Sequence, residues 1–155
     1  MSKSIAYLNL IRFFNPIGFW LLLWPGLWGL FLSGNMDISY FTIVVLGSFL
    51  TRSVGCAIND MIDIQYDKKV DRTKNRPLAN GDLTFKEALI FTIILAAACL
   101  YLLSLTNIQT ICLVLFVAVP MIVIYPLMKR FIAIPQLFLG ATFGLSLPIS
   151  YSMAE

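Results

Sequence analysis

A row of acidic side chains stands at the end of an apolar stretch in this chain. The acids follow one another at spacings of three, four and four, and an asparagine precedes them: Asn59, Asp60, Asp63, Asp67 and Asp71. On a helix, which turns by about 100° per residue, all five positions fall within an arc of about 120°. Carboxylates on one face repel each other unless a cation lies among them. The chain contains no His, so the row favours a hard divalent cation on oxygen ligands, Mg²⁺, in a site that handles phosphate.

Four members of the row are candidate metal ligands. Mg²⁺ usually takes one or two protein carboxylates and completes its shell with water and substrate phosphate oxygens. Asn59 and Asp63 stand four residues apart, as do Asp63 and Asp67, so either pair can hold one ion. The candidate ligands are Asn59, Asp60, Asp63 and Asp67. In the alternative interpretation, the acids only neutralise the basic residues that follow them, which are Lys68, Lys69, Arg72, Lys74 and Arg76.

Basic and aromatic residues elsewhere in the chain could complete such a site. Arg52 lies seven residues before Asn59, about 10 Å deeper along the same helical face. An arginine inside a membrane helix is costly unless it is paired or faces a wet cavity, and a carboxylated substrate would suit it. Snorkelling, or pairing with an acid of the row, is the alternative. Near the end of another apolar stretch, Lys129 or Arg130 could hold phosphate, and Tyr125 could meet a developing cation.

Membrane helices must position these residues. With 59% hydrophobic and 12% charged residues and a mean hydropathy of +0.87, the chain is not an ordinary soluble domain. Its apolar stretches approach the roughly 20 residues that span a bilayer. They lie near Pro16–Leu32, Ile38–Ile58, Ala88–Leu105, Ile108–Met128 and Ile132–Ser152. The composition therefore predicts an all-α, multi-pass transmembrane helical bundle of about five spans, with membrane lipid as a partner.

The basic residues predict an orientation for this bundle. With five spans, all 11 Lys and Arg residues fall at the N-terminus, in or after the second span, or after the fourth. The opposite loops, Ser33–Asp37 and Ser104–Asn107, carry none. By the positive-inside rule, the N-terminus and the acidic row face the cytoplasm. Nucleic-acid binding is not expected, because the basic residues stand beside acids in short loops.

Local signals indicate how the helices begin, end and pack. Thr84 and Glu87 fit a capping box, so a helix should begin near Phe85. The helix that carries the acidic row is expected to continue past the membrane face to about Asp71. Gly140–Gly144 is a small-xxx-small pattern suited to close helix contact. Three tryptophans at i, i+4 and i+8 form a stripe that could pack against neighbours or line a cavity: Trp20, Trp24 and Trp28.

Several motifs of the chain resemble those of UbiA-type intramembrane prenyltransferases, and in particular their 4-hydroxybenzoate polyprenyltransferase branch. The acidic row Asn59-Asp60-x-x-Asp63-x-x-x-Asp67 is similar to the first Asp-rich motif of the family. The segments Asn75-Arg76-Pro77-Leu78 and Tyr125-x-x-x-Lys129 are similar to its NRPL and YxxxK motifs. The YxxxK-like segment is followed by Pro135-Gln136, and Asn15–Gly18 and Leu22–Trp28 resemble the branch in particular. The resemblance covers essentially the whole chain.

The resemblance implies a reaction and assigns roles to residues. The family transfers a polyprenyl group from polyprenyl diphosphate to an aromatic acceptor, here the ring carbon ortho to the hydroxyl of 4-hydroxybenzoate, with Mg²⁺, in ubiquinone biosynthesis. The membrane would be the bacterial inner membrane. The resemblance implies that Asn59 and Asp63 are metal ligands, with Asp67 also in the motif, and that Asp63 and Asp67 take part in catalysis. Tyr125 would stand near the forming cation, and Lys129 would bind diphosphate. Arg52 would meet the acceptor carboxylate, and Arg12 and Arg76 would contact phosphate.

The resemblance also implies that more helices belong to this fold. Relatives have about nine helices and a second Asp-rich motif, DxxxD, which the remaining acids Asp37, Asp82, Glu87 and Glu155 do not form. We therefore expect residues 1–155 to be the N-terminal portion of a single prenyltransferase domain whose second half is absent, and a complementary C-terminal half as a partner. The alternatives are a truncated, non-catalytic membrane protein that binds a lipid diphosphate or a divalent cation, and an enzyme for another aromatic acceptor, such as homogentisate or a naphthoate.

Overall fold

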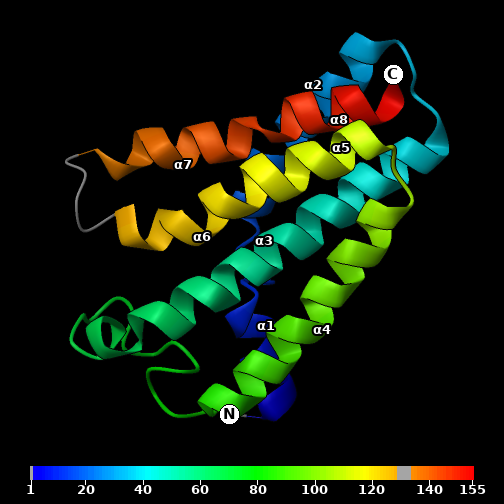
Figure 1. Ribbon diagram of the computed structural model, residues 1–155. Helices are drawn as coiled ribbons and strands as arrows, with labels where there is room; N and C mark the ends of the chain where they lie inside the picture. Colours follow the sequence, from blue (N-terminus) through cyan, green and yellow to red (C-terminus); the bar gives the residue numbers. More distant parts are fainter. Residues whose placement is uncertain (1, 129–133) are drawn as a thin grey trace.

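The computed structural model of the chain describes residues 2–128 and 134–155, and its helices confirm the predicted all-α fold (Figure 1). The helices follow one another in the order α1 (Lys3–Leu10), α2 (Ile17–Ser33), α3 (Ile38–Asp67), α4 (Phe85–Ser104), α5 (Ile108–Leu113), η1 (Val114–Ala118), α6 (Val119–Met128), α7 (Pro135–Gly144) and α8 (Ser146–Ala154). Within α5, η1 and α6 the chain stays helical, with one π-helical stretch at η1 just before Pro120. The short helix α1 was not predicted from the sequence.

The predicted membrane spans correspond to helices of the structure. Among the described residues, 4 helical segments are long and apolar enough to cross a membrane: Ile38–Asp67, Phe85–Ser104, Ile108–Tyr125 and Pro135–Ala154. The remaining predicted span is α2, which is apolar but only 17 residues long. At about 1.5 Å per residue, α2 measures about 26 Å, a little less than the hydrocarbon core of a bilayer. The last span is interrupted at Leu145, where α7 gives way to α8.

Helix α3 is long enough to carry the acidic row out of the membrane. Its 30 residues extend about 45 Å, whereas the hydrocarbon core is about 30 Å thick. The prediction that this helix continues to about Asp71 is wrong, because α3 ends at Asp67. The hydroxyl of Thr73 donates a hydrogen bond to the carbonyl of Asp67, 3.2 Å away. This bond helps to turn the chain back at the end of the helix, where the last carbonyl groups have no helical N–H partner.

The start of α4 confirms the predicted capping box. The backbone N–H of Thr84 donates to Glu87 Oε2 at 2.9 Å, and the backbone N–H of Glu87 donates to Thr84 Oγ1 at 3.3 Å. Two otherwise unpaired amides are thereby satisfied. Glu87 also forms an ion pair with Lys3, and this contact raises the pKa of Lys3 above its ordinary value. The pair joins α1 to the start of α4.

Close helix packing occurs on α2, not at the predicted Gly140–Gly144 pattern. A Cβ added to Gly29 would lie 2.2 Å from Ser150 Oγ and 2.3 Å from the carbonyl oxygen of Leu147, both on α8. A Cβ at Gly140 or Gly144 would meet no described atom within 4 Å. Among the described residues no side chain or helix covers that pattern, and small residues allow close approach only where a partner helix covers them.

Serine hydroxyls of α8 strengthen the contact with α2. Ser146 Oγ donates to the carbonyl of Leu22, and Ser150 Oγ donates to the carbonyl of Gly26, each at 2.6 Å. Pro25, which lies between the two accepting residues, lacks an N–H and leaves the carbonyl of Leu21, four residues before it, without its usual helical donor. The two serine hydroxyls bond other carbonyls of the same stretch of α2 and so tie this stretch to α8.

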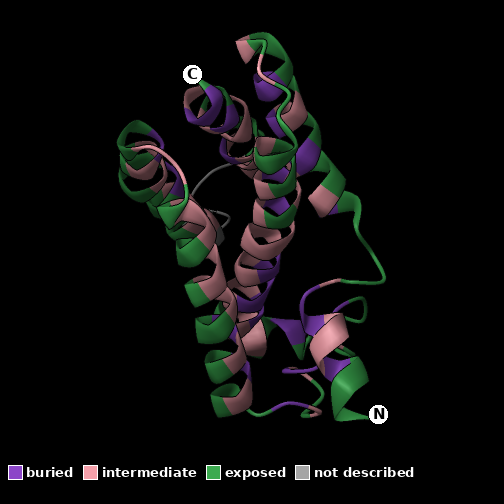
Figure 2. Cartoon of the chain, turned by 90° about the vertical axis from the view of Figure 1, so that its right-hand side faces the viewer, coloured by how far each residue is buried: buried purple, intermediate pink, exposed green. Residues whose placement is uncertain are grey.

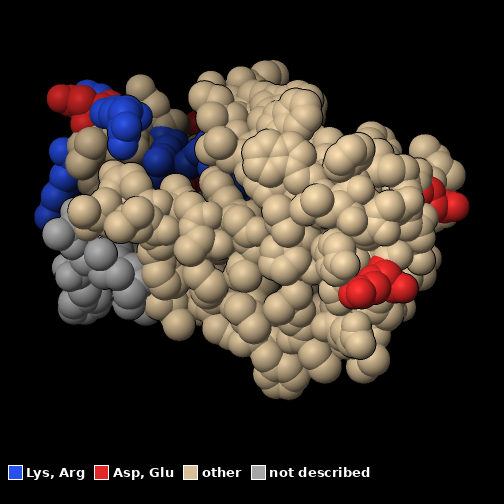
Figure 3. Space-filling model, turned by 90° about the horizontal axis from the view of Figure 1, so that it is seen from above, with Lys and Arg blue, Asp and Glu red and all other residues tan. Residues whose placement is uncertain are grey.

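The surface of the molecule is apolar along the helices and charged at one end. Exposed residues follow the outer faces of the helices, and the buried ones lie where helices meet (Figure 2). On the face shown in Figure 3, Lys and Arg side chains gather at one end and most of the remaining surface is uncharged. Trp20, Trp24 and Trp28 are each about half exposed. The chain is a multi-pass integral membrane protein.

Candidate functional site

The acidic row divides into groups with different surroundings. Asp60 is buried, with 1% of its side chain exposed. Both of its oxygens accept hydrogen bonds from Arg12 Nη2, at 2.7 and 2.9 Å, and Oδ1 also accepts one from Arg76 Nη1 at 3.1 Å. Two guanidinium groups therefore neutralise this carboxylate inside the protein.

Asp67 and Asp71 stand at opposite extremes of exposure. Asp67 is buried, and its Oδ2 accepts a hydrogen bond from Arg76 Nη1 at 2.8 Å. Arg76 thus joins Asp60 and Asp67, two helical turns apart. Asp71 lies beyond the end of α3, with its side chain 95% exposed, and pairs with Lys74 at 2.8 Å. A pair so exposed contributes little to stability.

Asn59 and Asp63 are the half-buried members of the row, one turn apart on α3. Their side chains offer an amide oxygen and a carboxylate, which are donors that Mg²⁺ accepts. Over residues 2–128 and 134–155, no group of three or more acidic, His or Cys side chains is gathered where it could hold a metal ion. The predicted four-ligand set stays a prediction, and the structure brings two of its members, Asp60 and Asp67, to arginines instead.

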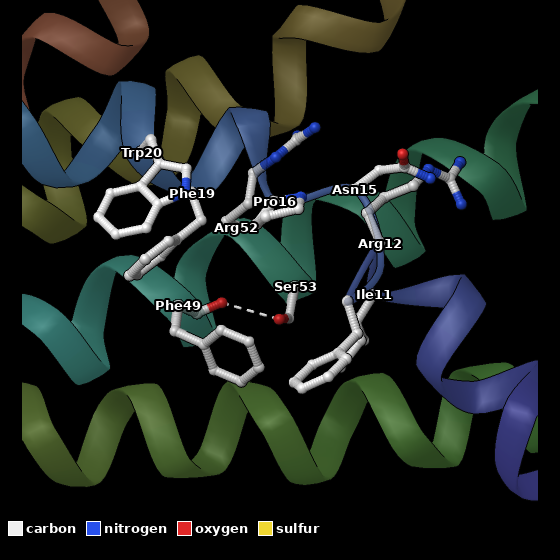
Figure 4. Close-up of a pocket in the computed structure, with 10 residues that line it drawn as sticks. Ile11, Arg12, Asn15, Pro16, Phe19, Trp20, Phe49, Arg52 and Ser53 are labelled. Carbon is white, nitrogen blue, oxygen red and sulfur yellow. Dashed lines mark hydrogen bonds between the residues drawn. The ribbon is translucent and has the colours of Figure 1, made fainter.

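A cavity of about 240 Å³ lies between the α1–α2 linker, the start of α2 and the middle of α3 (Figure 4). Most of its lining is apolar and aromatic. The polar residues of its lining are Arg12, Asn15, Arg52 and Ser53. The lining residues are Ile11, Arg12, Phe13, Asn15, Pro16, Phe19, Trp20, Phe49, Arg52 and Ser53.

Arg52 is held in this cavity in an unusual electrostatic setting. Its guanidinium packs so closely on Gly18 that a Cβ there would lie 2.1 Å from Nε. The guanidinium carbon lies 5.9 Å from the centre of the Phe143 ring of α7, in reach of a cation–π contact. Nε is buried without a hydrogen-bond partner, and no ion pair with an acid of the row is formed among the described residues. The alternative that Arg52 pairs with the row therefore fails.

The remaining predicted residues lie on or after α6. Tyr125 is half-buried on α6, and α6 packs against α3. Lys129 and Arg130 lie outside the described residues. The structure thus places Tyr125 on a helix that neighbours the one carrying Arg52, Asn59 and Asp63.

Several residues of the site were not predicted from the sequence. Phe49 and Ser53 stand four residues apart on α3, on one helical face that adjoins Arg52, and this spacing was a usable signal. The contact of Arg52 with Gly18 and Phe143 joins helices far apart in sequence, so no local pattern could reveal it. Arg12 adopts the left-handed conformation, with φ at 59°, which is uncommon for a residue with a side chain.

Comparison with known proteins agrees with this architecture. The chain is 49% identical to a 4-hydroxybenzoate octaprenyltransferase of Pasteurella multocida and 43% identical to one of Marinomonas, over 97% and 98% of its length. These matches cover 52% and 54% of the two relatives, so the chain spans about half the length of the curated relatives it matches.

Solved structures share the fold. One from work on digeranylgeranylglyceryl phosphate synthase superposes with a TM-score of 0.80 at 26% identity, covering 97% of this chain and 53% of that one. A UbiA homologue of Archaeoglobus fulgidus, bound to GPP and Mg²⁺, superposes with a TM-score of 0.79 at 21% identity, covering 96% of this chain and 54% of that one. The sequence profile described as the UbiA prenyltransferase family matches residues 22–155. The chain belongs to the UbiA prenyltransferase family.

Proposed function

We propose that this chain supplies the acceptor pocket and the first acidic motif of a 4-hydroxybenzoate polyprenyltransferase. The reaction moves a polyprenyl group from polyprenyl diphosphate to the ring carbon ortho to the hydroxyl of 4-hydroxybenzoate, in ubiquinone biosynthesis. The observation that carries the proposal is the buried, unpaired Nε of Arg52 in an aromatic cavity, on the helical face that also bears Asn59 and Asp63. The curated relatives are named as 4-hydroxybenzoate octaprenyltransferases.

The cavity suits an aromatic acid. Phe19, Trp20 and Phe49 offer apolar ring surfaces, against which an aromatic ring packs favourably. Arg52 offers a guanidinium whose Nε has no hydrogen-bond acceptor in the structure. The N–H groups of a guanidinium form a planar fork, and a carboxylate matches its geometry. An unsatisfied buried donor is costly in an apolar setting, so a bound carboxylate would remove a cost that the protein otherwise bears.

The diphosphate end of the donor is assigned to Asn59 and Asp63. Their oxygens fit Mg²⁺ in donor chemistry, with the remaining ligands expected from water and diphosphate. Mg²⁺, when bound, would offset the charge that develops on the departing diphosphate. The solved relative of Archaeoglobus fulgidus was bound to GPP and Mg²⁺. Along α3, Asn59 lies about 10 Å from Arg52, so the acceptor carboxylate and the diphosphate are held apart with room for the reacting carbons between them.

The proposed reaction breaks the allylic C–O bond and forms a bond between that carbon and the acceptor ring, which then loses a proton. Tyr125 would face the allylic cation with its ring or hydroxyl. Lys129 and Arg130 would hold the departing diphosphate. The apolar walls would keep water from the cation. The acidic motif and the N-terminus would face the cytoplasm, as the distribution of basic residues favours.

Transfer would take place in a complete family fold, of which this chain spans about half. The test is an assay in membranes that contain the chain and the part of the Pasteurella multocida relative that the chain does not match. With polyprenyl diphosphate, labelled 4-hydroxybenzoate and Mg²⁺, we expect labelled prenyl product, which EDTA abolishes and added Mg²⁺ restores. Binding of geranyl diphosphate without product in every preparation would favour a non-catalytic role. Preferential prenylation of homogentisate or a naphthoate would replace the proposed acceptor.

Substitution of Arg52 should weaken acceptor binding specifically. Trp20 lines the cavity, so quenching of its fluorescence reports 4-hydroxybenzoate binding once Trp24 and Trp28 are replaced by phenylalanine. In that background, we expect Arg52→Gln to raise the Kd for 4-hydroxybenzoate by about 10- to 100-fold, because a charge-assisted hydrogen bond is worth about 1.5–3 kcal/mol. Lys86→Gln, which removes an exposed cation at the start of α4, is the control. Equal Kd values for Arg52→Gln and the control would contradict the assignment.

A further inference from the structure

A buried cluster of charges joins three separate segments of the chain. Its members are Arg12, Asp60, Arg76 and Asp67, hereafter the arginine clamp. Asp60 accepts hydrogen bonds from both arginines, and Arg76 also donates to Asp67. The side chains of Asp60 and Asp67 are 1% and 10% exposed, and those of Arg12 and Arg76 are 22% and 25% exposed. The charges of the two acids are therefore balanced inside the protein itself.

The clamp ties two irregular segments to α3. Arg12 belongs to the α1–α2 linker, and its Nη1 also donates to the carbonyl of Asn9 at 2.9 Å. Arg76 belongs to the loop between α3 and α4. Beside the clamp, apolar residues from α1, α3, this loop and α4 pack together as one cluster: Ala6, Leu10, Ala57, Leu78, Leu83 and Ala88. The clamp and the cluster together fix the fold at the charged end of the molecule.

The linker that Arg12 holds is a wall of the cavity. Residues 11–13, 15 and 16 line it, and Arg12 keeps a left-handed backbone with φ at 59°. Such a conformation costs about 1 kcal/mol or more for a residue with a side chain and persists only where the surroundings enforce it. The double hydrogen bond from Arg12 to Asp60 is a constraint of that kind, so the ion pair and the shape of the cavity are linked.

We propose that Asp60 and Asp67 are positioning residues, which use Arg12 and Arg76 to hold the cavity wall and the α3–α4 loop in place, while metal binding is left to Asn59 and Asp63. The acidic row would then contain two sets of residues: Asp60 and Asp67 would stabilise the fold, and Asn59 and Asp63 would bind the metal ion. Arg12 and Arg76 would hold carboxylates of the protein and not phosphate. The part of this inference that concerns metal binding rests on the proposed function; the structural part does not.

Trypsin tests the structural part. The loop carries exposed cleavage sites at Lys68, Lys69, Arg72 and Lys74, whereas Arg76 precedes Pro77, a bond that trypsin does not cut. In the 155-residue chain in detergent or vesicles, we expect Asp60→Asn and Arg76→Gln each to speed loop cleavage by about tenfold or more. Glu155→Gln, which removes an exposed acid far from this loop in the sequence, should leave the cleavage rate unchanged. Unchanged rates in both clamp variants would overturn the proposal.

A double-mutant cycle distinguishes loss of the contact between two clamp residues from a general loss of folding. Arg76→Gln leaves the buried carboxylate of Asp67 without its partner, and Asp67→Asn leaves Arg76 with Asp60 alone, whereas the double variant has two neutral side chains at the Arg76–Asp67 contact. The double variant should therefore be cleaved more slowly than the product of the single effects predicts. Strict additivity would mean that the two residues act separately, and the clamp would be disproved.

Metal binding tests the division of labour within the row. The probe is Mn²⁺ with geranyl diphosphate, followed by electron paramagnetic resonance. We expect Asp67→Asn to keep the Mn²⁺ affinity within about threefold of the original chain and Asp63→Ala to lower it by tenfold or more. An equal loss in Asp67→Asn would make Asp67 a ligand and overturn the proposal. If the original chain binds no Mn²⁺, the proposed function fails in this respect, whereas the trypsin result still decides the structural role of the clamp.

Discussion

Replacing Asp63 by alanine should lower prenyl transfer by on the order of 10²–10³-fold, as loss of a group that stabilises transition-state charge typically does. Asp63 is the half-buried carboxylate of the row, and Asn59 lies one turn before it. Asn59 and Asp63 together are proposed to hold the divalent cation that binds diphosphate. Without the carboxylate of Asp63, only the amide oxygen of Asn59 remains as a ligand from this pair. The measurement is the rate of product formation in the membrane assay with the remainder of the Pasteurella multocida relative.

Two comparisons make this result specific. Asp71→Asn removes an acid from the same row at a position that is 95% exposed, and it should keep the original rate. The Kd of Asp63→Ala for 4-hydroxybenzoate, read from Trp20 fluorescence, should stay unchanged, because the carboxylate lies about 16 Å along α3 from Arg52. Retained transfer activity in Asp63→Ala would show that the leaving diphosphate is stabilised elsewhere.

Gly29→Ala should destabilise the protein by about 1–3 kcal/mol, the usual cost of adding a methyl group to a packed site. The new Cβ would lie 2.3 Å from the backbone carbonyl oxygen of Leu147, so α2 and α8 must move apart. The serine hydrogen bonds to α2 would lengthen with them. Thermal unfolding in detergent, followed by circular dichroism, measures the loss as a lower midpoint temperature.

Gly140→Ala is the matched control for this substitution. A Cβ at Gly140 meets no described atom within 4 Å, and alanine is favoured over glycine in a helix interior by about 1 kcal/mol. Its midpoint should stay the same or rise. Ser150→Ala combined with Gly29→Ala should recover part of the loss, because it removes the hydroxyl that the new methyl group meets at 2.2 Å. A Gly29→Ala variant as stable as Gly140→Ala would contradict the tight α2–α8 contact.

Patterns that act within one helix could be predicted from the sequence. The spans, the capping box at Thr84 and the row on α3 each depend on local periodicity or on neighbours three or four residues apart. The end of α3 at Asp67 was missed, because a hydrogen bond from Thr73, across a turn, helps to end the helix there. The helix α1 was missed because its 8 residues are too few to show a clear period.

Contacts between distant segments could not be predicted. Asp60 pairs with Arg12 and Arg76, which are 48 and 16 residues away in the sequence. A row of acids on one helical face does not show which arginines of other segments will lie beside it. The position of the close glycine contact could not be predicted for the same reason. Gly140–Gly144 and the glycines of α2 are similar as sequence, and only the position of α8 decides which of them lies in a close contact.

The contact between α2 and α8 also bears on how the chain is made. The hydrogen bonds of Ser146 and Ser150 to α2 each join residues 124 positions apart. At a synthesis rate of about 5–20 residues per second, the glycine face of α2 waits about 6–25 s for its partner to leave the ribosome. During that interval α2 is without the neighbour whose serine hydroxyls bond the carbonyls of Leu22 and Gly26. The span formed by α7 and α8 therefore completes the contacts of α2, and a stall in synthesis between them would leave the glycine face of α2 without its partner.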